Sequence, residues 1–144
     1  MSTIVEFFAA ADDASAALAL SAGPQPGSES LSFGNFDPTE AVVEWECLLV
    51  GGSPDELVAA GEPRLVGGEY DGGGVVLALS PRLSAALAGA GRAALRDAAA
   101  AWSSQRAEYG EVIDGEIAEA ILTELADLVS SARGRGEGVY CWVA

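Results

Sequence analysis

The sequence predicts an α+β domain in which a small sheet of about three strands is covered by several helices. Three observations indicate this class. A long amphipathic segment over 116–136 leads into an alternating, aromatic segment over 138–143. Two other short apolar runs, 3–9 and 75–79, have the length and composition of strands. Helix-type patterns fill the chain between them. With 144 residues, half of them hydrophobic, the chain is expected to form a single domain over 1–144.

The C-terminal third is expected to be the centre of the domain. Apolar side chains recur at three- and four-residue steps after residue 116, which places them on one face of a helix. Asp114 is expected to cap this helix, and the basic, glycine-rich segment 133–136 is expected to end it. The predicted buried stripe consists of Ile117, Ile121, Leu125 and Leu128.

The last segment predicts a strand whose two sides differ. Val139, Cys141 and Val143 alternate with Tyr140 and Trp142, so the two sets are expected on opposite faces of a sheet. If Tyr140 and Trp142 point away from the helices, they form a candidate partner surface, because exposed aromatic patches often mark interfaces.

The N-terminal part begins with a strand over 3–9, followed by a short helix headed by Asp12 and Asp13. The segment 21–34 is rich in proline, glycine and serine and is expected to be a flexible loop within the domain. Asp37 or Thr39 is then expected to cap a helix that ends at a pair of glycines.

That helix is expected to have a buried and a wet face. Val42 and Trp45 fall in the buried stripe, and Glu40, Glu44 and Glu46 fall outside it. A short helix over 53–61 and a glycine-rich loop over 62–74 are expected next.

The middle of the chain predicts a buried strand running into a helical region. The strand 75–79 is followed by Ser80, a helix cap, with Pro81 in the first turn. In the next helix, Leu95, Ala99 and Trp102 are expected to face the core. Arginines of the same helix, including Arg106, are expected to stay in water.

Several of these segments resemble the YfbM-like family of bacterial proteins of unknown function. The matching features are the opening strand 4–8, the Leu-Leu-Val-Gly turn at 48–51, the strand 75–79 entering a helix through Ser-Pro, and the Arg-Gly turn before the last strand. The resemblance implies a fold and no defined activity. The chain departs from the family where a tryptophan is usual, at Val42, and where a histidine is usual, at Glu46.

The composition excludes several functions. Acids outnumber bases 22 to 7, all the bases are arginine, and the net charge is −15. We therefore expect no nucleic-acid partner and no anionic membrane partner. Histidine is absent, which removes the most common general base and zinc ligand. No apolar stretch is long enough for a membrane span, no basic leader starts the chain, and the two cysteines are expected to be reduced, so a cytoplasmic location is expected.

One pair of residues is a candidate for chemistry. Glu40 and Glu44 are four residues apart on a predicted helix, so their carboxylates share one face, where they could hold a hard cation or simply be solvated. We expect the solvated face, with no metal, no cofactor and no catalytic residue.

Two hypotheses for function follow. The first is a non-enzymatic, inhibitor- or immunity-like protein that binds a basic protein partner, with Glu40, Glu44, Tyr140 and Trp142 as its possible partner surface. The alternative is a small-molecule-binding or carboxylate- or metal-assisted enzyme domain, with a cleft beside Glu40, Glu44 and Arg64.

Overall fold

The computed structural model describes residues 4–24, 29–34, 36–69 and 74–144. They form an α+β fold around a five-stranded antiparallel sheet with the strand order β2-β1-β5-β4-β3. The C-terminal strand is central, because it pairs with β1 on one side and with β4 on the other. The strands are β1 (Val5–Ala10), β2 (Ser30–Phe33), β3 (Arg64–Glu69), β4 (Gly74–Ala78) and β5 (Gly138–Val143).

The sheet has five strands where the sequence predicted about three. The three predicted strands are adjacent and form its centre, and the two additional strands are its edges. β2 lies within the predicted loop 21–34, where Leu31 and Phe33 alternate with serines and pack against the core. β3 lies within the predicted loop 62–74, and its register shifts between Leu65 and Gly67. Residues 25–28 and 70–73 of the two predicted loops lie outside the described residues.

There is a physical reason why neither edge strand was predicted. An edge strand contacts few apolar side chains, so backbone hydrogen bonds can hold polar or glycine-rich sequences there. In β3 both consecutive glycines have close neighbours, but only Gly68 lies against backbone, which cannot move aside as a side-chain end can. A Cβ on Gly67 would lie 2.8 Å from Leu20 Cδ1, and one on Gly68 would lie 2.2 Å from the carbonyl oxygen of Gly74. Gly68 also has a φ of +80°, which favours glycine.

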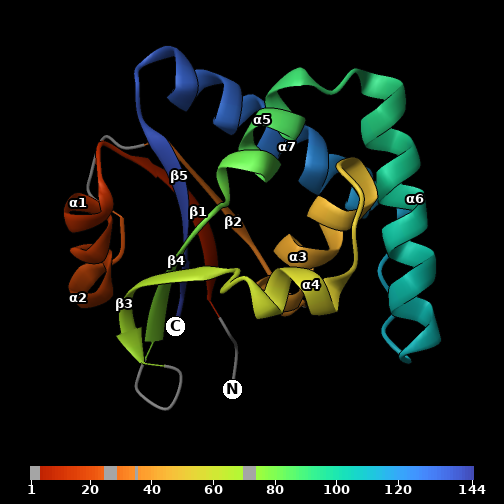
Figure 1. Ribbon diagram of the computed structural model, residues 1–144, viewed down its shortest axis with the longest axis horizontal. Helices are drawn as coiled ribbons and strands as arrows, with labels where there is room; N and C mark the ends of the chain where they lie inside the picture. Colours follow the sequence, from red (N-terminus) through yellow and green to blue (C-terminus); the bar gives the residue numbers. More distant parts are fainter. Residues whose placement is uncertain (1–3, 25–28, 35, 70–73) are drawn as a thin grey trace.

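Helices cover the two faces of the sheet unequally (Figure 1). One face carries a thick layer, and the other carries only the short helices α1 (Asp13–Ala17) and α2 (Ala19–Ala22). Side chains that sequence patterns predicted as caps do cap their helices, including Asp12, Ser80 and Asp114. The thick layer contains α3 (Pro38–Leu49), α4 (Pro54–Ala59), α5 (Pro81–Gly89), α6 (Arg92–Glu108) and α7 (Gly115–Gly134).

The large core lies between the sheet and the thick layer. α7 supplies its centre, with Ile121, Leu125 and Leu128 buried as predicted. Ile117 is the exception, because it is 58% exposed. The buried face of α7 is centred on Leu122 and Leu125. At 100° per residue, Ile117 falls at the edge of that face in the first turn, so its prediction as a core residue is wrong.

A smaller core fills the other face of the sheet. The alternation in β5 sends Val139 and Cys141 into the large core and Tyr140 into the small one, as the period of two predicts. Helices α1 and α2 contribute Ala16 and Ala19, two small side chains that let the helices lie close to the strands.

Candidate functional site

A buried arginine organises the candidate site. Arg106, near the end of α6, is only 7% exposed and is surrounded by three carboxylates. Its Nη1 lies 2.8 Å from Glu44 Oε2, and its Nη2 lies 3.1 Å from Glu40 Oε2. Glu111 accepts two hydrogen bonds, from Nε at 3.1 Å and from Nη2 at 2.7 Å. The prediction that Arg106 stays in water is wrong, since these carboxylates satisfy its guanidinium in place of solvent.

The positions of these groups follow from two helices. Glu40 and Glu44 are one turn apart on α3, so both face α6. The second oxygen of Glu44 accepts a hydrogen bond of 2.9 Å from Trp102 Nε1. Trp102 is fully buried and packs edge-on against Trp45, with ring centroids 5.2 Å apart. Glu44 is therefore fixed to the core on one side and to Arg106 on the other.

The charge at this site is strongly negative. Hydrogen bonds to Glu111, and next to Glu44, outweigh the cost of burial and hold the pKa of Arg106 well above its ordinary value. The guanidinium stays protonated under all ordinary conditions. Glu40, Glu44 and Glu111 together outnumber it, so the cluster attracts a further cation.

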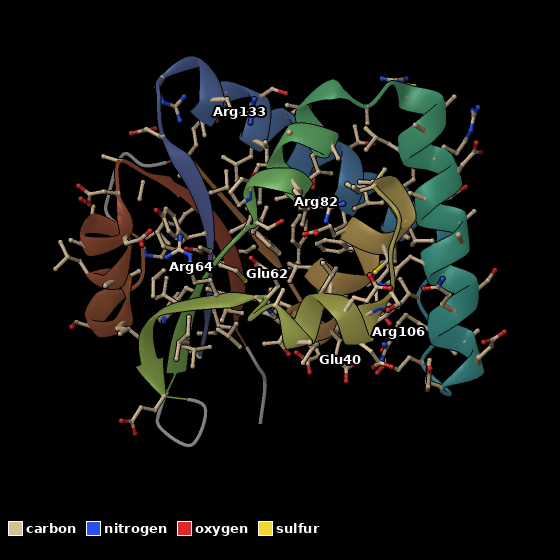
Figure 2. The ribbon with its side chains drawn as sticks, in the orientation of Figure 1. Glu40, Glu62, Arg64, Arg82, Arg106 and Arg133 are labelled. Atoms are coloured by element: carbon tan, nitrogen blue, oxygen red, sulfur yellow. The ribbon has the colours of Figure 1, made fainter. Side chains whose placement is uncertain are left out.

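A cavity of about 650 Å³ opens beside this cluster. It lies between α3, α4, the segment 61–63 before β3 and the end of α6, and Figure 2 shows Glu40 and Arg106 near one another in this region. Apolar and polar groups both contribute to its wall, and Tyr109 and Val58 are largely exposed. The cavity is lined by Thr39, Glu40, Val43, Glu44, Pro54, Val58, Gly61, Glu62, Pro63, Arg106 and Tyr109.

The prediction that Glu40 and Glu44 lie together is confirmed. The arginine beside them is Arg106, however, and not Arg64 as predicted. Arg64 does not line this cavity. It pairs with Asp13 across the sheet edge, with 2.5 Å between Nη1 and Oδ2, and lines a separate cavity of about 220 Å³. Figure 2 shows Arg64 close to α1 and well apart from Glu40 and Arg106. A signal for the true partner exists in the sequence, because Arg106 follows the core residue Trp102 by one helical turn.

The aromatic pair of the last strand does not form an open surface. Tyr140 and Trp142 do point away from the thick helical layer, but α1 and α2 cover that face. Tyr140 is buried, and its hydroxyl donates a hydrogen bond of 2.8 Å to Asp13 Oδ1. Trp142 is half-buried, with its ring against Gly23. Tyr140 is therefore covered, and of the aromatic pair only Trp142 stays partly exposed.

A second buried carboxylate was missed. Glu46 was expected to be outside the buried stripe of α3 but is 3% exposed, because α5 begins directly beside it. The hydroxyl of Ser80 donates a hydrogen bond to Glu46 Oε1 and accepts one of 3.0 Å from the N–H of Leu83. Arg82 is the nearest cation, at 4.0 Å. The adjoining cavity of about 10 Å³ is too small for a substrate, so the pair closes the junction of α3 and α5.

The remaining reactive groups suit structure better than chemistry. Burial raises the pKa values of both thiols, Cys47 and Cys141, and nearby glutamates raise that of Cys47 further. Both are therefore weak nucleophiles. Within the described part of the chain, no three Cys, Asp or Glu side chains are grouped so as to hold a metal ion. At the Glu40–Glu44 face, the guanidinium of Arg106 occupies the position between the carboxylates.

Comparison with known proteins gives no relative: no protein-family model, curated protein sequence or solved structure matches the chain. The resemblance to the YfbM-like family therefore stays an expectation. No helix among the described residues has the length and apolar character needed to cross a membrane.

Proposed function

We propose that this chain is a non-enzymatic binding protein that takes a basic segment of a partner protein on the cavity beside Arg106. The main support for this proposal is that Glu40, Glu44 and Arg106 converge at a cavity of about 650 Å³ that is open to solvent. An inhibitor- or immunity-like role and a cytoplasmic location belong to the same proposal.

Charge and apolar surface both support a macromolecular partner. The net charge of −15 accelerates encounters with a basic protein, and the local excess of carboxylates directs them to the cavity. The cavity is also lined by exposed side chains with apolar surface, Val58 and Tyr109. A protein surface that combines cationic and apolar groups would be complementary to both features.

A small cationic molecule is the second candidate, favoured by the size of the cavity. Its volume falls within the range of about 300 to 1,000 Å³ that is usual for small-molecule sites. An amine or guanidine compound would satisfy the carboxylates in the same way. The two candidates differ in the area that they would bury, since only a protein would also cover the surface around the cavity.

The proposed function is tested by capture of basic proteins at low salt with two charge-matched variants. Replacing the cavity carboxylates in Glu40→Gln/Glu62→Gln should abolish binding of a basic partner that the wild type retains. The same change of charge in Glu116→Gln/Glu124→Gln, at exposed positions of α7, should leave binding nearly intact. Equal loss in both variants would show that net charge alone is responsible, and retention in both would refute the cavity as the site.

A thermal-shift series separates the second candidate. A ligand that binds only the folded state raises the unfolding temperature, and the increase grows with the ratio of free ligand concentration to Kd. Small amines and guanidines, divalent cations and nucleotides would be compared on the wild type and on Glu40→Gln/Glu62→Gln. Stabilisation by a small amine alone, lost in the cavity variant, would favour a small-molecule site over a protein partner.

A further inference from the structure

We propose that the cavity selects arginine over other cations, because the open face of Tyr109 provides a stacking platform beside free carboxylate oxygens. This inference depends on the proposed function and names the group that the basic partner would insert. Three features of the cavity carry it: the fixed ring of Tyr109, the unused acceptors at its wall and an apolar surface for the aliphatic stem.

Tyr109 is held in place on one side only. It directly follows α6, and its backbone N–H donates a hydrogen bond of 3.0 Å to the carbonyl oxygen of Arg106. The guanidinium carbon of Arg106 lies 5.3 Å from the centre of the ring, within the range of a cation–π contact. Since three carboxylates fix Arg106, they also fix one face of the ring. The residue is nevertheless 74% exposed and lines the cavity, so most of its surface is accessible to a ligand there.

Two carboxylates of the cavity retain free acceptors. Glu40 uses one oxygen on Arg106, and its side chain is otherwise largely exposed. Within the described ranges, no side-chain donor contacts the carboxylate of Glu62, which also lines the cavity. An entering cation would therefore find acceptors without displacing Arg106 from Glu44.

These features distinguish a guanidinium from an ammonium. A guanidinium is planar and weakly hydrated, so it can stack on an aromatic ring while its N–H groups point sideways to carboxylates. A lysine ammonium is a compact, strongly hydrated charge that gains less from the ring. Val58 and Pro54 add an apolar wall for the three methylene groups of an arginine side chain. The cavity thus combines a stacking face, anionic acceptors and a surface for the stem.

Short oligo-arginine and oligo-lysine peptides of equal length test the inference at physiological salt. The wild type should bind the arginine peptide about fivefold to tenfold more tightly, as measured by calorimetry. Tyr109→Leu should bring the two affinities close together by weakening only the arginine peptide. Tyr109→Phe keeps the ring and should retain the preference. Because Tyr109 is exposed, both variants should keep the circular dichroism spectrum of the wild type.

The outcomes separate this inference from the proposed function. If Tyr109→Leu keeps the preference for arginine, the stacking role is refuted, even where Glu40→Gln/Glu62→Gln still weakens both peptides and so supports the proposed function. If the wild type binds both peptides equally, selectivity is refuted in the same way. If the wild type binds neither, the basic-partner proposal fails as well.

Discussion

The two faces of the sheet are closed by different means. On the thick side, α3, α5, α6 and α7 bury a continuous apolar core, and a few polar side chains such as Glu44 and Arg106 pair with one another beside it. On the thin side, α1 and α2 supply small residues over a few strand side chains, and a polar contact between Tyr140 and Asp13 completes the closure. Carboxylate–arginine pairs occur on both sides. The pair of Arg106 with Glu44 on the thick side is largely buried, whereas the pair of Arg64 with Asp13 on the thin side is about half exposed.

This difference favours the thick side of the sheet as the location of a binding site. Arg106 is held by three carboxylates and by a helix whose inner face is anchored in the large core, so this part of the cavity wall is fixed by several contacts. Arg64 and Asp13 are each about half exposed, and solvent weakens their attraction. A rigid, pre-charged wall orders few groups on binding and therefore retains more of its interaction energy.

The largest effect is expected from the centre of the thick side. Leu125→Ala should lower the free energy of unfolding by about 2 to 5 kcal/mol, because Leu125 has no exposed surface and its loss leaves a cavity. Ile117→Ala on the same helix is the matched control and should cost less than about 0.5 kcal/mol, since its side chain is mostly exposed. Urea denaturation measures both. Similar costs for the two variants would contradict the described facing of α7.

The next effect compares the two arginines. Arg106→Met should lower the free energy of unfolding by about 2 kcal/mol, because it leaves Glu44 partly buried without its cation. Arg64→Met removes an exposed pair and should cost less than about 1 kcal/mol. Denaturation at low and high salt checks the comparison. Equal costs for the two variants would contradict the difference in burial on which the proposed site depends.

The same contrast explains how far the sequence could predict the fold. Apolar periodicity identified α7 and β5, because a buried face leaves its period in the sequence, and short apolar runs identified the two neighbouring strands β1 and β4. The edges β2 and β3 left no such pattern, since backbone pairing holds serine and glycine there. Caps such as Asp37 and Ser80 were predictable because the cap contacts lie within three residues.

The candidate site was only half predictable, for the opposite reason. Glu40 and Glu44 are close in sequence, so their shared face follows from helix geometry alone. Arg106 lies 62 residues from Glu44. Its position one turn after Trp102 places it on the core side of α6, but nothing local identifies the carboxylates that it contacts. The burial of Glu46 similarly depends on where α5 begins, which is a tertiary contact. The alternation in β5 predicted the correct face for Tyr140. It could not predict that α1 covers this face, because that contact joins distant parts of the sequence.

The smallest effect concerns the polar contact on the thin side. Tyr140→Phe removes the hydrogen bond to Asp13 and should cost about 1 kcal/mol at neutral pH. Burial, together with that bond, raises the pKa of Tyr140 to about 12, against about 10 in an unfolded chain. The folded state thus favours the neutral phenol. Its contribution is complete below about pH 10 and is lost as the pH rises toward 12.

The difference in stability between wild type and Tyr140→Phe should therefore shrink over this alkaline range. Cys141 also titrates in alkali, but it is present in both proteins and cancels from the difference. Urea denaturation of both proteins at a series of pH values measures this difference in stability. A difference that stays constant from neutral pH to about 12 would mean that Tyr140 titrates as in the unfolded chain. In that case α1 would not shield its hydroxyl, and the thin side would be open to solvent.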